Sequence, residues 1–171
     1  MSNRAAAINS LTYIAALVLL NASLTFVNVW PTLSIRPALS LSPETAVCVF
    51  GLALAGPMLV TRRRAALRWL GGLWVVLVLG RYVDVTTRSL YGREINLYWD
   101  IRNIPDVGAM LAFVANPLAL VAVIAGAVLL PLLIYFPVRW ALSRVIAATA
   151  EPRVRRWSIG AAAVVLVVGL V

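Results

Sequence analysis

The stretch VGAMLAFVANPLALVAVIAGAVLLPLLIYF, residues 107–136, carries no charged side chain. A helix needs about 20 apolar residues to cross the roughly 30 Å of hydrocarbon in a bilayer, so this stretch is long enough to span a membrane with some tilt. The whole chain is 63% hydrophobic and 12% charged over 171 residues. A soluble domain of this length has too small an interior for so much apolar surface. The sequence therefore predicts an all-α, polytopic membrane protein.

Four other apolar segments lie on either side of this stretch, separated by arginine clusters or short polar stretches. Their lengths predict about five transmembrane helices, at residues 11–30, 43–60, 65–85, 107–136 and 157–171. Ser42, Pro43 and Glu44 are typical of a helix start, because they supply a capping hydroxyl, a first-turn proline and an acid at the positive end of the dipole. Residues 32–41 contain proline and serine and are expected to form a loop.

The first and last segments each leave an alternative open. Arg4 followed by an apolar core is also typical of a secretory signal peptide, but the apolar run continues to Trp30, which favours an uncleaved anchor. Residues 157–171 would form a helix of only ~22 Å, which is short of a full span. Either this helix stops within the membrane or the chain continues beyond it. We expect residues 1–171 to form a single transmembrane domain, the N-terminal part of a longer protein.

Arginine supplies all 15 basic residues, and its distribution predicts an orientation. Loops on the cytoplasmic side of a membrane carry an excess of basic residues. Ten arginines and one acid fall on the side of the N-terminus, whereas five arginines and five acids fall on the other side. The first set is Arg4, Arg62, Arg63, Arg64, Arg68, Arg139, Arg144, Arg153, Arg155 and Arg156 with Glu151. The second set is Arg36, Arg81, Arg88, Arg93 and Arg102 with Glu44, Asp84, Glu94, Asp100 and Asp106. We expect a multi-pass protein of the bacterial inner (cytoplasmic) membrane, with a cytoplasmic N-terminus and a C-terminus facing the periplasm or exterior.

Residues 81–106 hold four of the six acids and four of the arginines. Arg81 and Asp84 are three residues apart on one helix face, at the expected outer edge of the hydrocarbon, where an unpaired charge is costly. Either the two side chains neutralise each other, or they bind an anionic lipid headgroup, since a guanidinium grips phosphate in two places. Arg93 and Arg102 complete the candidate headgroup set, and membrane lipids are the expected partners.

Residues 96–104, NLYWDIRNI, alternate apolar and polar side chains. This pattern fits a short helix that lies in the outer interface with its aromatic side chains at headgroup depth. Tyr91, Tyr98 and Trp99 are the expected interfacial anchors. Tyr91, Gly92 and Arg93 predict a turn before this helix, because glycine permits the bend.

Catalytic and metal-binding residue types are scarce. Histidine is absent, and Cys48 is the single cysteine, which removes the usual general base and the commonest metal ligands. We therefore assign no catalytic residue, no metal site and no cofactor to this chain. The net charge of +9 does not predict nucleic-acid binding, because the arginines mark the ends of apolar segments.

The run RYVDVTTRSLYGREINLYWD, residues 81–100, resembles the N-terminal membrane domain of sulfatase-like hydrolases and transferases of the alkaline phosphatase superfamily. These include the lipoteichoic-acid synthases and phosphoglycerol or phosphoethanolamine transferases. The likeness lies in Arg81-Tyr-x-Asp84 at the end of one span, in Gly92-Arg-x-x-Asn-Leu97 beyond it, and in the five-span layout. It implies a membrane anchor and lipid-substrate platform for a C-terminal catalytic domain. The nucleophile and the divalent metal of such enzymes belong to that domain.

A function of another class fits the same sequence. The competing hypothesis is a stand-alone small multi-span membrane protein, such as a transporter subunit or an assembly factor. These two hypotheses differ in whether a large soluble domain with metal-binding residues follows Val171. Whether the parent protein is an enzyme therefore stays open at the level of sequence.

Overall fold

The computed structural model describes residues 3–29, 34–38, 40–94, 96–114 and 116–168. Most of these residues are helical, as the composition predicts. The described helices are α1 (Asn3–Ala22), α2 (Pro43–Thr61), α3 (Arg63–Tyr91), α4 (Leu97–Val114), α5 (Pro117–Thr149) and α6 (Pro152–Val168). A two-stranded antiparallel hairpin, β1 (Phe26–Val29) and β2 (Ser34–Pro37), lies between α1 and α2.

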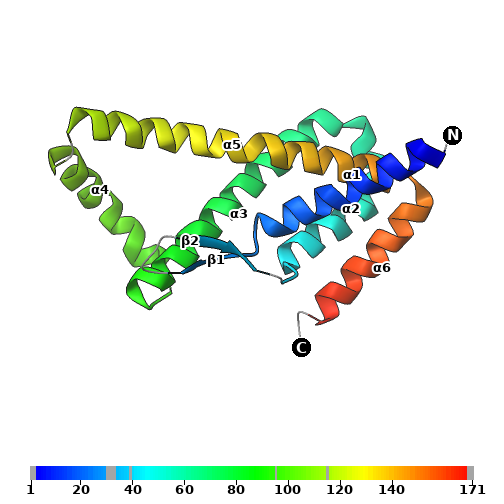
Figure 1. Cartoon of the computed structure of the whole chain (residues 1–171), viewed down its shortest axis with the longest axis horizontal. Helices are drawn as coiled ribbons and strands as arrows, with labels where there is room; N and C mark the ends of the chain where they lie inside the picture. Colours follow the sequence, from blue (N-terminus) through cyan, green and yellow to red (C-terminus); the bar gives the residue numbers. More distant parts are fainter. Residues whose placement is uncertain (1–2, 30–33, 39, 95, 115, 169–171) are drawn as a thin grey trace.

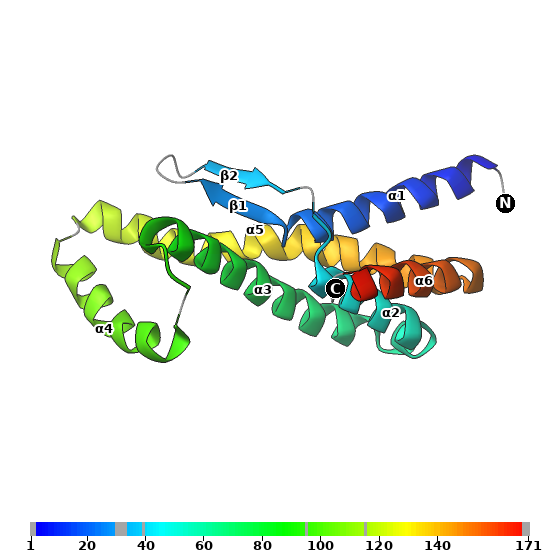
Figure 2. The same ribbon diagram turned by 90° about the horizontal axis from the view of Figure 1, so that it is seen from below.

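The helix α5 is the element around which the others assemble. Helices α1, α2, α3 and α6 all pack against it, and α2 also packs along α6. The most deeply buried side chains include Leu142, Val145 and Ile146 of α5, together with Leu20 of α1. The turn between α2 and α3, the turn between α5 and α6, and the N-terminus lie toward one end of the molecule (Figures 1 and 2). The hairpin, the end of α3 and α4 lie toward the other.

Helices α3 and α5 approach each other closely at Gly71. A methyl group on Gly71 would lie 2.8 Å from Cε2 of Tyr135, so the absence of a side chain permits this contact. One turn further along α3, Trp74 is 3% exposed, and its Nε1 donates a hydrogen bond of 2.9 Å to Ser23 Oγ. This bond ties α3 to the end of α1.

The first helix has the predicted length of 20 residues but lies eight positions closer to the N-terminus, at Asn3–Ala22 instead of 11–30. Helix α1 ends at Ala22, not at residue 30, and the chain then enters β1. The hydroxyls of Ser23 and Thr25 donate to the carbonyls of Leu20 and Asn21, which offers the backbone an alternative to further helix. Phe26 to Val29 is rich in residues that favour strands and pairs with Ser34–Pro37, so the expected loop at 32–41 contains a strand.

The boundary between the fourth and the interfacial segments is also displaced. Residues 97–114 form one helix, so the expected short helix at 96–104 continues past Pro105 into the expected span. The break falls at Asn116, whose side chain caps α5 by accepting from Ala119 N, with Pro117 following at the first helical position. Asn116 supplies a capping side chain and Pro117 a first-turn proline, which together are typical of a helix start.

The remaining helices are longer than predicted at their polar ends. Helix α3 extends to Tyr91, whereas its predicted end is residue 85. Helix α5 extends to Thr149, whereas the predicted end of that segment is residue 136. Helix α6 begins at Pro152, five positions before the predicted start at residue 157, and residues 169–171 lie outside the described chain. Apolar patterning misses these turns because they are charged. Gly92 ends α3 with φ of 64°, which agrees with the predicted bend.

Two of the described helices are long and apolar enough to cross a membrane, in the ranges Arg63–Leu90 and Pro117–Thr149. This is fewer than the five spans predicted from sequence. Within α1 and α2, the apolar stretches among the residues described in full are Asn9–Ala22 and Pro43–Ala55.

Candidate functional site

Asp84, in the last third of α3, is the centre of an ion-pair network. Its Oδ2 lies 3.4 Å from Arg81 Nη1, and its Oδ1 accepts a hydrogen bond of 3.0 Å from Arg88 Nε. Arg88 Nη2 in turn lies 3.3 Å from Glu94 Oε1. The two contacts of Asp84 follow from i,i+3 and i,i+4 spacing on one helix face, whereas Glu94 lies beyond the end of α3. The structure thus brings Arg81 and Asp84 together, and it adds Arg88, which the sequence analysis did not place in the set.

A cavity of about 550 Å³ lies where Arg81 and Asp84 face the beginning of α2. Arg81 Nε is buried there, and it has no hydrogen-bond partner among the described residues. Glu44 lines the same cavity, and its Oε2 accepts a short bond of 2.6 Å from Ser42 Oγ. The site therefore combines a guanidinium that has hydrogen-bonding capacity to spare with two carboxylates.

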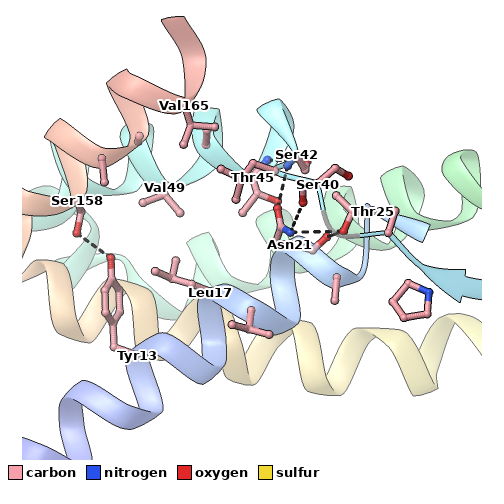
Figure 3. A pocket seen from close by; sticks show the side chains of 18 residues that line it. Tyr13, Leu17, Asn21, Thr25, Ser40, Ser42, Thr45, Val49, Ser158 and Val165 are labelled. Atoms are coloured by element: carbon pink, nitrogen blue, oxygen red, sulfur yellow. Dashed lines mark hydrogen bonds between the residues drawn. The ribbon is translucent and has the colours of Figure 1, made fainter. Parts of the chain in front are cut away.

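A second cavity of about 680 Å³ adjoins the first (Figure 3). Thr25, Ser40, Leu41 and Ser42 line both. Helices α1, α2 and α6 form the walls of this cavity. Its further lining residues are Tyr13, Leu17, Val18, Asn21, Ala22, Pro37, Ala38, Thr45, Ala46, Val49, Ser158, Ala161, Ala162 and Val165. None of the lining residues is charged, and most are aliphatic, so this cavity suits an apolar ligand.

Asn21 organises the polar end of this larger cavity, at the junction with the first. Its Nδ2 donates 2.8 Å to Ser40 O, and its Oδ1 accepts 2.8 Å from Ser42 N (Figure 3). Ser42 is the N-cap of α2, and its Oγ accepts from Thr45 N at 3.1 Å. Thr45 is 7% exposed, yet its Oγ1 has no partner among the described residues. The polar end therefore holds one buried, unsatisfied hydroxyl.

Tyr13 and Ser158 line the opposite end of the cavity. Tyr13 of α1 and Ser158 of α6 lie 2.7 Å apart through their hydroxyl oxygens (Figure 3). Ser158 also donates to Val154 O within α6. The two residues are 145 positions apart in sequence, and this contact fixes α1 relative to α6.

Arg93 forms a separate polar centre at the start of α4. Its guanidinium contacts both oxygens of Asp100, at 2.8 and 3.2 Å, in a bidentate arrangement. Asp100 Oδ2 also accepts 2.8 Å from Asn96 N, which caps the helix. The bond from Arg93, followed by that from the Asn96 amide, lowers the pKa of Asp100 below the ordinary value. Arg93 therefore stabilises a helix start, and it does not line either cavity.

Arg102, Tyr98 and Trp99 form a cluster on the same helix. The guanidinium of Arg102 lies 5.8 Å from the centroid of each ring, and the rings meet edge to face at 5.1 Å. Tyr98 and Trp99 are 67% and 60% exposed, as is suitable for interfacial anchors. Arg102 does not line either cavity. Tyr91 is the last residue of α3, and its side chain lies outside the part that the structure describes.

Sequence reasoning missed Asn21, Thr45, Tyr13 and Ser158. A signal for three of them is visible in hindsight. Asn21, Tyr13 and Ser158 are polar residues inside apolar segments, where such side chains need a partner. Their partners are far away in sequence and therefore cannot be identified without the fold. Thr45 has no such signal, because any helix N-terminus accommodates a threonine.

No three His, Cys, Asp or Glu side chains of the described residues are placed to share a metal ion. No family model matches the chain, and no curated protein or solved structure is significantly similar to it. The likeness of residues 81–100 to sulfatase-like enzymes therefore stays a prediction from sequence.

Proposed function

We propose that this chain is a membrane-spanning domain that binds a lipid headgroup at its outer end and anchors a sulfatase-like hydrolase or transferase domain there. The observation that carries the lipid-binding part is Arg81. Its Nε is buried and lacks a partner among the described residues, and the residue lines a cavity of about 550 Å³. A phosphate oxygen satisfies such a donor, and arginine binds phosphate with defined geometry.

The apolar surface of α5 supports a location in the membrane. Its most hydropathic window has a mean hydropathy of 2.7, and none of that window is buried in the protein. A core helix of a soluble protein would be mostly covered. Leu118, Val121 and Leu133 illustrate the exposure at 78%, 62% and 69%. Hydrocarbon is the solvent in which this surface is stable.

Aromatic side chains support two membrane boundaries. Trp69, Trp140 and Trp157 are partly or largely exposed near the arginine-rich end, and Tyr98 and Trp99 are exposed at the other. Tryptophan and tyrosine favour the headgroup region on both sides of a bilayer. Along α3, Trp69 and Arg88 are roughly 30 Å apart at ~1.5 Å per residue, which is the thickness of the hydrocarbon.

We further propose that α1, α2 and α6 cross the membrane together with α3 and α5. Helices α1 and α2 have 20 and 19 residues, or roughly 30 Å each. Consecutive helices in this set run in opposite directions, which is what successive crossings require (Figure 1). Ten arginines then share the N-terminal side and are expected in the cytoplasm of a bacterial cell.

The charged residues of the headgroup cavity indicate which class of headgroup it would bind. Asp84 is shared by Arg81 and Arg88, whereas Glu44 has no arginine within ion-pair distance among the described residues. A purely anionic headgroup gains contacts to Arg81 but is repelled by Glu44. A headgroup that joins a phosphate to a cationic group satisfies both. Phosphate is the chemistry common to the two cases.

The experiment compares lipid retention by the wild-type protein and by a double variant, R81M/D84L, which replaces both charged side chains with uncharged, apolar ones. Native mass spectrometry of the detergent-purified protein is carried out with added phosphatidylglycerol or phosphatidylethanolamine. The double variant is expected to fold and to lose the bound lipid. R102M is the matched control, because it removes an arginine at the same end that lines neither cavity. Equal lipid retention by the folded double variant and the wild type would leave the pair with a structural role alone.

A further inference from the structure

We infer that the cavity of about 680 Å³ between α1, α2 and α6 holds one acyl chain of a phospholipid, with the ester group of that chain hydrogen-bonded to Thr45. This inference rests on the proposed membrane location and deepens the proposed lipid site, because it assigns the apolar part of the ligand. It adds a binding role for residues of α1, α2 and α6, which the headgroup cavity does not require.

The side chains that line the cavity indicate the chemical class of its ligand. Leu17, Val18, Val49 and Val165 supply branched aliphatic side chains, and five alanines keep the centre open. Tyr13 is the single aromatic residue in the lining, so flat rings have little to stack on. The volume falls within the roughly 300–1,000 Å³ range of small-molecule sites. A flexible aliphatic chain fits such walls, because they offer dispersion contacts without hydrogen bonds.

Among the described residues that line the cavity, Thr45 has the single buried side-chain polar atom without a hydrogen-bond partner. We expect the polar part of the ligand to lie next to it. Thr45 is more than nine-tenths buried, and its Oγ1 has no partner, which is costly inside a protein. Threonine in a helix can occupy two χ1 rotamers, so its hydroxyl can exchange places with its methyl group and turn toward the cavity. The carbonyl oxygen of an ester can accept one hydrogen bond from this hydroxyl, which would give Thr45 the partner that it lacks.

The orientation of the cavity agrees with that of a lipid in the outer leaflet. Its polar end, at Asn21 and Thr45, adjoins the cavity of Arg81 through Ser40, Leu41 and Ser42. Its apolar body extends toward Tyr13, roughly 12 Å deeper along α1. A phospholipid with its phosphate at Arg81 therefore places its ester region at the junction and one chain along α1. The Tyr13–Ser158 pair, joined by a hydrogen bond of 2.7 Å, lines the deep end.

Two variants and one matched control test this assignment. A161F fills the cavity from α6, where Ala161 lines it and is exposed. V164F adds a similar ring on the same helix, at a residue that is 62% exposed and does not line the cavity. T45V removes the hydroxyl with little change in shape. Each protein is titrated with palmitoyl-oleoyl phosphatidylethanolamine in detergent, and bound lipid is counted by native mass spectrometry.

We expect A161F to weaken the first lipid-binding step by about 10-fold or more, as excluding two methylene groups from the cavity would. T45V is expected to weaken it by about 5-fold, the effect of one net hydrogen bond. V164F is expected to bind like the wild type. Thermal unfolding of each variant identifies any that does not fold. If A161F does not fold, the lipid binding of T45V, which keeps the shape of the side chain, tests the inference alone.

Binding by A161F and T45V that equals binding by V164F would overturn the inference. Comparison with R81M/D84L separates this failure from failure of the proposed headgroup site. If R81M/D84L loses lipid while A161F and T45V retain it, the headgroup site stands and the acyl-chain cavity is refuted. If A161F and T45V lose lipid while R81M/D84L retains it, the acyl-chain cavity stands without the Arg81 site.

Discussion

The arginines at the two ends of the helical bundle have different contact partners. At the end that carries the N-terminus, ten arginines share one acid, Glu151, and the described contacts are to neutral groups. Arg63 donates to Ser143 O at 3.1 Å, and Arg139 and Arg144 lie 5.9 Å from the ring centroids of Tyr135 and Trp140. At the opposite end, five arginines meet five acids, and Arg81, Arg88 and Arg93 all contact carboxylates.

The two arrangements of charge have different physical effects. An excess of cations with no carboxylate partner is a long-range feature that orients a protein in a membrane and attracts anionic lipid surfaces. Paired charges cancel at long range and instead fix local geometry. The end with paired charges therefore builds a defined site, in which the Nε of Arg81 and the carboxylate of Glu44 keep capacity for a ligand.

The largest expected effect of a single change at the outer end is that of D84N. It leaves Arg81 and Arg88 without the carboxylate that joins them, and Asp84 is only 21% exposed. We expect the free energy of unfolding to fall by about 1–3 kcal/mol, less than for a fully buried pair because the site is partly wet. Chemical unfolding in detergent measures it.

E94Q is the matched control for D84N, because Glu94 is 79% exposed and contacts only the outer side of the same network. An exposed ion pair contributes less than about 1 kcal/mol. If E94Q and D84N destabilise the protein equally, the network is not centred on Asp84.

The middle of the bundle, between the two charged ends, depends on packing. G71A places a methyl group 2.8 Å from Tyr135 Cε2, so either this ring or α3 must shift. G72A meets nothing within 4 Å and serves as the control. Alanine in place of helical glycine favours the helix by about 0.5–1 kcal/mol. We expect G72A to raise the unfolding temperature and G71A to lower it relative to G72A. Equal unfolding temperatures would mean that α3 and α5 do not approach closely at Gly71.

The smallest expected effect is local and depends on pH. Arg93 and Asn96 N lower the pKa of Asp100, so the folded α4 favours the charged carboxylate. Its contribution is fully present above the ordinary aspartate pKa and is lost as pH falls through the lowered value. Hydrogen exchange of the first-turn amides of α4, corrected for the intrinsic rate, should show loss of protection only at acidic pH. D100N should show the loss at every pH, and D106N should behave like the wild type.

The sequence predicted a helical protein with arginine clusters at the ends of its segments, because both depend on local patterns. It also predicted the start of α2 from Ser42, Pro43 and Glu44, and the bend at Gly92, where cap chemistry is local. It failed at residues 23–29. There, an apolar run has the hydrophobicity of a membrane helix, but its side chains bond to preceding carbonyls and its strand-forming residues pair with Ser34–Pro37.

The candidate site was only half predictable. Arg81 and Asp84 are neighbours on one helix, so their spacing was enough to pair them. The cavity of α1, α2 and α6 depends on side chains from distant segments, such as Tyr13 and Ser158, and no local pattern encodes that distance. Arg93 and Arg102 were grouped with Arg81 by proximity in sequence, but the turn at Gly92 and the helix α4 give them other partners.

Single-cysteine labelling tests our proposal that the arginine-rich end faces the cytoplasm and the end with paired charges faces outward. Cys48 is replaced by serine, and one cysteine is introduced at the exposed positions Ala65, Ala150 or Asn103. Intact cells are treated with a membrane-impermeant maleimide. We predict labelling of N103C in intact cells, and labelling of A65C and A150C only after permeabilisation. Labelling of A65C and A150C from outside, with N103C protected, would contradict the account.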